Sequence, residues 1–312
     1  MGLYVYSHNL LGPSVAVRIY TNNIRYDNRN RPDEFEQPWK KRRVQSINSM
    51  DFHSSSQANV VCLQEVLHHQ LIDILTSLNK HKDEKWSYYG VGRQDGVTKG
   101  EYAPILFKSK EWRILENSTY WLSETPWKPS RGWDAALERI VTMVTLESLH
   151  NPLVKINVLN THYDHRGKVA RRKSSKLIID KMENFNSYPS FLCGDFNTQP
   201  SDEPYQILTK AGFKDSRKLI DWDDSYGHSS TFTGFDKDHE GDSIIDYIWS
   251  PYFTRSDEVE TESINYFGLD HHKYYDIVLR QFGILHNYFK GFYFSDHRPV
   301  VATYIIRRIR LF

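Results

Sequence analysis

The sequence predicts an α/β fold in which helices pack on the faces of β-sheets. Two observations lead to this prediction. Short runs of β-branched and apolar residues recur along the 312 residues, and polar segments with helical spacing separate them. In addition, no linker divides the chain into regions of different composition, so we expect a single domain that spans residues 1–312.

Seven apolar or β-branched runs have the length of buried strands. They predict strands at residues 15–20, 59–63, 139–146, 154–159, 190–193, 244–249 and 300–305. Helical spacing predicts helices at residues 39–50, 67–78, 169–185 and 201–210, of which the last would have Ser201 as its N-cap. Residues 221–241 and 266–293 are expected to form long loops or irregular insertions.

The charge balance restricts the class of ligand. Lys and Arg together number 40 and Asp and Glu 39, which gives a formal net charge of +1. A protein that binds long duplex DNA usually carries a marked positive charge, so nothing in the overall charge points to one. A small or short phosphorylated substrate remains compatible with this composition.

Cysteine usage and hydropathy indicate an intracellular protein. Cys62 and Cys193 lie inside apolar runs, where a free thiol behaves as a small hydrophobic group, so we expect no disulfide framework. No segment has the ~18 to 20 consecutive apolar residues that span a bilayer, and no signal peptide is evident. We therefore expect a cytoplasmic or otherwise intracellular monomer without a transmembrane segment.

Polar side chains lie at the ends of five of the predicted strands, and a sixth strand has a carboxylate within it. These positions are Asn23, Glu65, His162, Asp195 with Asn197, Asp296 with His297, and Asp246 inside its strand. Each residue taken alone has a structural explanation, such as a helix cap or a turn. Asp246 is different, because a carboxylate in a buried strand requires a partner, and a histidine is the obvious candidate. Together, oxygen ligands suit Mg²⁺, and a histidine–carboxylate pair suits proton transfer.

Three ordered motifs resemble the endonuclease/exonuclease/phosphatase superfamily, which has the DNase I-like fold. They are Leu63-Gln64-Glu65, Gly194-Asp195-Phe196-Asn197 and Ser295-Asp296-His297-Arg298-Pro299. The resemblance extends from about residue 15 to residue 305, the expected core, and implies a four-layer α/β/β/α sandwich. Residues 100–105, 120–126 and 131–136 are similar to an uncharacterised microbial and fungal branch. One departure is Asn22, where relatives commonly have an aromatic residue.

The resemblance implies a divalent cation and a catalytic set. Glu65 would be the principal Mg²⁺ ligand, with Asn23 and Asp296 nearby, and Mn²⁺ is a possible substitute. The implied catalytic residues are Asp195 as general base, Asn197 holding the attacking water or the carboxylate, His297 oriented by Asp246, and His162 contacting a phosphoryl oxygen.

Five further residues are candidates for substrate binding. Arg139 matches a phosphate-supporting position of relatives, although a buried ion pair explains it equally well. Glu101 and Tyr102 would line the pocket, adjoin the metal or form a simple turn. Asp164, like its neighbour His165, would contact substrate or be solvated. Trp133 would stack on a base or sugar, or else pack in a loop.

These observations predict a hydrolase that cleaves a phosphodiester or phosphomonoester by metal-assisted attack of water. The aromatic content and the resemblance lean slightly toward a nuclease, of the 3′–5′ exoribonuclease or deadenylase kind. The alternative is a phosphatase or phosphodiesterase that acts on a small sugar, inositol or lipid-headgroup phosphate. An inactive binding scaffold is a remote third possibility, because a scaffold has no reason to retain the whole set.

Overall fold

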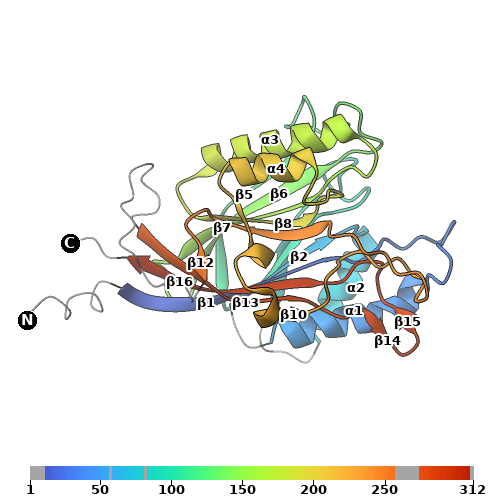
Figure 1. The fold of residues 1–312 in the computed structure, drawn as a ribbon, viewed down its shortest axis with the longest axis horizontal. Coiled ribbons are helices and arrows are strands. Elements are labelled where there is room, and N and C mark those ends of the chain that lie inside the picture. The colour runs from blue at the N-terminus through green and yellow to red at the C-terminus, as the bar shows by residue number, and fades with distance from the viewer. Residues whose placement is uncertain (1–10, 56–57, 81–82, 84, 257–273, 310–312) are drawn as a thin grey trace, which may run out of the picture.

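Two β-sheets packed face to face form the centre of the molecule, and helices cover their outer faces (Figure 1). The computed structural model describes residues 11–55, 58–80, 83, 85–256 and 274–309. Helices α1 and α2 lie on one side of the sandwich and helices α3 and α4 on the other (Figure 1). The predicted α/β/β/α sandwich with two mixed sheets is confirmed.

The first sheet contains the strands from the two ends of the described chain. Its order is β10-β13-β16-β1-β2-β4-β3, and β12 pairs with β13. The strands are β1 (Leu11–Asn23), β2 (Ala58–Gln64), β3 (Trp86–Tyr89), β4 (Ile105–Lys108), β10 (Tyr226–Gly227), β12 (Arg255–Ser256), β13 (Tyr275–Ile284) and β16 (Val300–Ile309). Strands β1 and β2 are parallel, whereas β16 runs antiparallel to β1.

The second sheet has the order β5-β6-β7-β8-β11-β9. Its strands are β5 (Trp112–Trp121), β6 (Ile140–Ser148), β7 (Lys155–His162), β8 (Ser190–Asp195), β9 (Lys214–Asp215) and β11 (Asp246–Ser250). Strands β7 and β8 are parallel, and β11 is antiparallel to β8. A separate hairpin joins β14 (Tyr288–Phe289) to β15 (Phe292–Tyr293).

Three apolar clusters hold the layers together. The largest lies between the sheets and contains, for example, Val17 and Ile19 of β1, Val158 of β7 and Phe191 of β8. The other two lie between a sheet and its helices. Strands β2 and β6 are buried along their whole length, because one face meets the other sheet and the opposite face meets a helix.

The helices are α1 (Trp39–His53), α2 (His68–Leu78), α3 (Lys168–Phe185) and α4 (Glu203–Lys210), with single 3₁₀ turns at Ser216–Lys218 and Trp222–Asp224. The prediction of Ser201 as the N-cap of the last helix is wrong, because Asp202 occupies that position. The amide of Asp202 bonds to the carbonyl of Gln199, and its carboxylate accepts from the Gln199 amide. This closed turn includes Ser201 and delays the start of the helix.

All seven predicted strands are present. Strands β4, β5 and β13 were not predicted, although β5 and β13 are long and β4 lies inside its sheet. Strand β13 falls within 266–293, where we expected loops, and this expectation is wrong for residues 275–284; residues 266–273 lie outside the described residues. A β-bulge between Leu279 and Gln281 interrupts the alternation of β13. Strand β5 lies at a sheet edge and is largely exposed, and β4 has only four residues, so neither gives a clear hydrophobic pattern.

Both cysteines are buried and free, as predicted. Among the described helices, none combines the length and the apolar character that crossing a bilayer requires.

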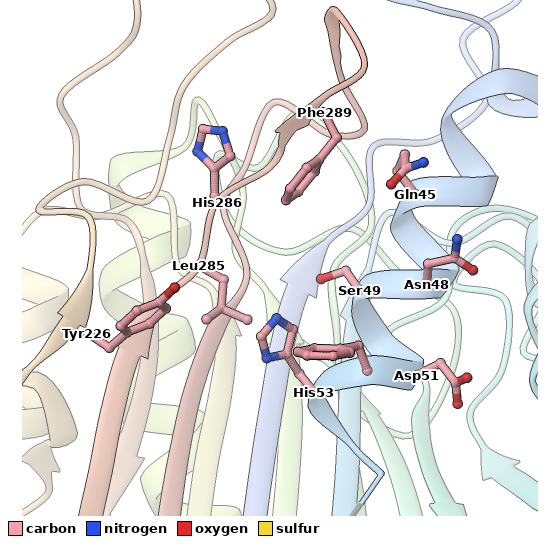
Figure 2. Close-up of a pocket in the computed structure, with 10 residues that line it drawn as sticks. Gln45, Asn48, Ser49, Asp51, His53, Tyr226, Leu285, His286 and Phe289 are labelled. Carbon is pink, nitrogen blue, oxygen red and sulfur yellow. The ribbon is translucent and has the colours of Figure 1, made fainter.

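A cavity of about 550 Å³ lies between α1 and the strand ends near β13, away from the polar strand ends identified in the sequence. Figure 2 shows Gln45, Asn48 and Ser49 from α1 on one side of it and His286 and Phe289 on the other. None of the predicted site residues contributes to its lining. A second cavity, of about 380 Å³, is lined in part by predicted site residues.

Gly194, one residue before Asp195, tolerates no side chain. Its φ is +141°, and an added Cβ would lie 1.9 Å from the carbonyl oxygen of Thr161 on β7. We expect Gly194→Ala to lower the free energy of unfolding by about 3 kcal/mol, because overpacking and a positive φ each cost about 1–2 kcal/mol or more. Urea unfolding followed by circular dichroism would measure this loss.

Gly234→Ala is the matched control for that prediction. Gly234 also has a positive φ, of +67°, but no atom lies within 4 Å of the position that an added Cβ would occupy. It should therefore lose only about 1 kcal/mol, the cost of the backbone conformation. Equal losses in the two variants would contradict the explanation that a side chain at position 194 collides with the backbone of Thr161.

Candidate active site

Strand direction brings the predicted residues to one edge of the sandwich. Asn23 and Glu65 follow the parallel strands β1 and β2, and His162 and Asp195 end the parallel strands β7 and β8. Parallel strands deliver their carboxyl ends to the same edge. The antiparallel strand β11 begins with Asp246 at this edge, where Asp246 pairs with Asp195.

The cavity of about 380 Å³ lies at this edge. Seven of the thirteen predicted site residues line it: Glu65, Glu101, Arg139, His162, Asp195, Asn197 and His297. Three lining residues, Arg25, Glu65 and Asn197, have φ values between +46° and +58°. Among the described non-glycine residues only six have a positive φ, so half of them are at this site. Such backbone strain is found preferentially at functional sites.

Asp195 is the centre of the polar cluster. Its Oδ2 accepts a hydrogen bond from Nδ2 of Asn23 at 3.0 Å and lies 3.4 Å from Nε2 of His162 and 3.8 Å from Nε2 of His297. Its Oδ1 accepts from the amide of Asn197 at 2.9 Å. Burial raises the pKa of Asp195 to about 7, Asp246 adds to the increase, and His297 opposes it.

His297 forms a buried pair with Asp246. Its Nδ1 lies 2.9 Å from Oδ2 of Asp246, and the Asp246 side chain is fully buried. Burial alone would lower the pKa of His297, but Asp246 and Asp195 outweigh burial and raise it well above the ordinary histidine value. His297 is therefore a positively charged donor whose Nε2 faces Asp195.

His162 has the opposite electrostatic character. Burial and the nearby guanidinium groups of Arg139 and Arg93 lower its pKa well below the ordinary value. Nδ2 of Asn197 lies 3.2 Å from its Nε2 and also donates to the carbonyl of Tyr163 at 3.0 Å. The site thus holds one cationic and one neutral imidazole on either side of the same carboxylate.

Glu65 and Asp296 share a charged environment with Arg25. Nδ2 of Asn23 donates to Oε1 of Glu65 at 3.1 Å, and the amide of Tyr26 donates to Oε2 at 3.1 Å. Burial would raise the pKa of Glu65, but Arg25 and the hydrogen bond from Asn23 lower it overall. Burial dominates at Asp296 and raises its pKa, although Nη1 of Arg25 lies 3.9 Å from its Oδ2.

Two groups of side chains have the chemistry to hold a divalent cation. Ligand atoms of Asp195, Asp246 and His297 lie within 4.8 Å of one another. However, His297 uses Nδ1 for Asp246, and its raised pKa leaves no lone pair for a metal. The carboxylates of Glu65 and Asp296 offer hard oxygen atoms and fit Mg²⁺ better. Asn23, a predicted ligand, presents its amide nitrogen to Glu65 and would have to turn that amide over to join them.

Arg139 and Glu101 also line the cavity. Only 4% of Arg139 is exposed, and its Nη1 has no hydrogen-bond partner among the residues that the structure describes. Glu101 accepts two hydrogen bonds from Arg93, at 2.7 and 2.9 Å, and lies 3.8 Å from Nδ1 of His162.

The other three predicted substrate-binding residues do not line the cavity. The Tyr102 hydroxyl donates to the carbonyl of Val97, and the ring packs in the cluster beneath α2. The Asp164 carboxylate is buried and accepts hydrogen bonds from the amide of Gly167 and from Nε of Arg139. Trp133 is half-buried, and its amide donates to the carboxylate of Glu124.

Three residues at the site had no assigned role in the sequence analysis or only a generic one: Arg25, Arg93 and His165. Arg25 follows Asn23 by two positions and contacts Asp296. Arg93 lies on a loop eight residues before its partner Glu101. His165 is exposed, and its Nδ1 lies 3.0 Å from Nη2 of Arg139. The position of Arg25 directly after a strand end was a usable signal, but Arg93 carries no such signal.

Comparisons with known proteins identify a family and several structures of the same fold. The Endonuclease/Exonuclease/phosphatase family matches residues 23–297. An endonuclease/exonuclease/phosphatase family protein from Bacteroides thetaiotaomicron is 26% identical, with a TM-score of 0.79 over 96% of this chain and 100% of its own. A mannosyl-6-phosphatase from the same bacterium is 27% identical, with a TM-score of 0.76 over 92% of this chain and 99% of its own.

A more distant structure, the human nocturnin catalytic domain, shares the fold at 16% identity, with a TM-score of 0.64 over 94% of this chain and 96% of its own. No curated protein matches the sequence. The family match begins at Asn23 and ends at His297, so it includes every predicted catalytic and metal-binding position. The chain therefore belongs to the endonuclease/exonuclease/phosphatase family and is a hydrolase that acts on phosphate esters.

Proposed function

We propose that this protein is a Mg²⁺-dependent phosphoesterase that removes the phosphate group from a phosphorylated sugar. The observation that carries the proposal is the environment of Asp195, which lies beside a cationic and a neutral histidine in a small polar cavity. A carboxyl group whose pKa lies near neutrality, with two imidazoles beside it, suits activation of water next to a phosphoryl group.

The side chains divide the work between proton transfer and charge stabilisation. Asp195, with a pKa of about 7, takes the proton from the attacking water. The backbone amide of Asn197 fixes the orientation of the Asp195 carboxylate by donating a hydrogen bond to Oδ1. His297 donates from Nε2 to the phosphoryl oxygens as negative charge accumulates, and Asp246 keeps its ring charged and oriented. His162 and Arg139 line the same cavity and offer further donors to the phosphoryl group.

The cation would be held by the carboxylates of Glu65 and Asp296. Asn23 would join them after its side-chain amide has turned over to present its oxygen. When bound, Mg²⁺ would polarise a phosphoryl oxygen and stabilise the leaving oxygen. Arg25 balances part of the negative charge of these two carboxylates, which reduces their mutual repulsion.

The choice of a phosphorylated sugar over a nucleic acid has three supports, and it departs from the slight lean to a nuclease in the sequence analysis. The net charge of +1 provides little long-range attraction for a polyanion. The cavity, of about 380 Å³, has the size of a small-molecule site. The mannosyl-6-phosphatase covers nearly the whole chain at 27% identity, whereas the likeness to nocturnin, at 16%, extends only to the fold.

A substrate panel in the presence of Mg²⁺ tests this function. We expect release of inorganic phosphate from mannose 6-phosphate or another hexose phosphate, and little degradation of poly(A) RNA, single-stranded DNA or a bis-aryl phosphodiester. EDTA should abolish turnover, and excess Mg²⁺ or Mn²⁺ should restore it. Efficient cleavage of RNA or DNA with no hydrolysis of sugar phosphates would establish the nuclease alternative instead.

A further inference from the structure

The mouth of the active-site cavity has a polar group that the proposed reaction leaves unused. His165, on the loop after β7, lines the cavity but lies outside the cluster centred on Asp195. Leu137, Tyr26 and Phe232 also line the cavity, so apolar surface accompanies the imidazole. A pyranose ring has both apolar C–H faces and hydroxyl groups, and it requires both kinds of surface.

Arg139 determines which nitrogen of His165 carries the proton. Nη2 of Arg139 lies 3.0 Å from Nδ1 of His165, and a guanidinium group can only donate. Nδ1 therefore accepts, and the proton of the neutral ring resides on Nε2. The nitrogen that remains available to a ligand is consequently a donor.

The position of this imidazole is fixed by the preceding residue. The Asp164 carboxylate accepts hydrogen bonds from the amides of Leu137, Arg166 and Gly167, and from Nε of Arg139 at 3.4 Å. The loop that carries His165 is thereby tied to the segment that carries Leu137. A side chain on such a braced loop is already in place before a ligand arrives.

The same guanidinium has one nitrogen left for the substrate. Nη1 of Arg139 is buried and has no partner within the described part of the chain, and Arg139 lines the cavity. An unsatisfied buried donor is costly unless a ligand completes it, and a phosphoryl oxygen is a suitable acceptor. Arg139 therefore connects the phosphate side of the cavity to His165.

We propose that His165 is a specificity-determining residue that donates a hydrogen bond from Nε2 to a hydroxyl group of the substrate's sugar, while Arg139 binds the phosphate and holds His165 in this tautomer. This inference rests on the proposed function, because it assigns the part of the site that recognises the sugar of the phosphate ester. Burial and the charge of Arg139 lower the pKa of His165, which keeps the ring neutral at physiological pH.

Steady-state kinetics on two monoesters test the inference. Mannose 6-phosphate has ring hydroxyls, whereas phenyl phosphate has none. For His165→Ala we expect KM for mannose 6-phosphate to rise about tenfold with kcat within about twofold, the effect of losing one hydrogen bond made equally in the ground and transition states. The kinetic constants for phenyl phosphate should stay within about twofold of wild type.

Two further variants separate recognition from structure. His165→Gln retains an acceptor for Arg139 and an N–H donor, and it should restore KM for mannose 6-phosphate to within about threefold of wild type. His286→Ala removes an exposed histidine that lines the other cavity (Figure 2), and it should behave as wild type on both substrates.

The outcomes distinguish this inference from the proposed function. If wild-type enzyme hydrolyses mannose 6-phosphate and His165→Ala either has no effect or impairs both monoesters equally, the inference is wrong and the proposed function stands. If wild-type enzyme hydrolyses no sugar phosphate of the substrate panel, the proposed function is wrong and the inference falls with it. A loss confined to the sugar phosphate, with rescue by glutamine, supports both.

Discussion

Asp195→Asn should reduce kcat by about 10²- to 10⁴-fold, the usual contribution of a general base. The substitution preserves the shape of the side chain but removes the carboxylate that lies 3.4 Å from His162 and 3.8 Å from His297. No other described carboxylate lies between these two imidazoles. Phosphate release from the best substrate of the panel, at saturating Mg²⁺, would measure the effect.

Asp276→Asn is the matched control for the Asp195 variant. Asp276, on β13, pairs with Arg255 of β12 and lies outside the lining of the active-site cavity, so its replacement should leave kcat within about twofold. Thermal unfolding of both variants would verify that they fold. A kcat for Asp195→Asn within about tenfold of wild type would rule out Asp195 as the general base.

Glu65→Gln should weaken Mg²⁺ binding by at least about 100-fold. Replacing an outer-shell partner of a metal site already costs about 10–100-fold in affinity, and loss of a charged ligand should reach at least the upper end of that range. Burial of Glu65, with Arg25 lowering its pKa, leaves a carboxylate that is charged and positioned before any cation binds. Titration calorimetry with Mg²⁺, without substrate, would measure this affinity directly.

Glu116→Gln removes the same charge from an exposed position on β5 and should bind Mg²⁺ like wild type. The calorimetric measurement is independent of turnover, so it separates a defect in cation binding from a defect in chemistry. If Glu65→Gln binds Mg²⁺ with unchanged affinity, the cation site lies elsewhere, and the cluster of Asp195, Asp246 and His297 becomes the next candidate.

The local sequence predicted the structure correctly where a residue type by itself requires a particular environment. The carboxylate of Asp246 within an apolar strand required a buried partner, and the structure places Nδ1 of His297 at 2.9 Å from it. The fully buried strands β2 and β6 stood out as runs rich in apolar and β-branched residues. By contrast, β13 was missed because its bulge breaks the alternation, and β5 because an exposed edge strand needs no apolar pattern.

Interactions between distant residues could not be read from the chain. Nothing in the sequence indicates that Arg93 forms a double hydrogen bond with Glu101, or that Arg139 joins Asp164 to His165. The choice between a phosphate contact and a buried ion pair for Arg139 was also open. The structure shows that one guanidinium forms the ion pair and still has a nitrogen without a partner among the described residues, because its three nitrogens point in different directions.

The sequence by itself determined the fold class, the family and the residues with the chemistry for a phosphoesterase, because strand periodicity and motif order are properties of neighbouring residues along the chain. Only the tertiary structure decided the charge of each group. His297 and His162 are the same residue type, yet Asp246 makes one a cation and burial beside Arg139 keeps the other neutral. Protonation depends on what is packed within a few ångströms, and those neighbours come from strands far apart in the chain.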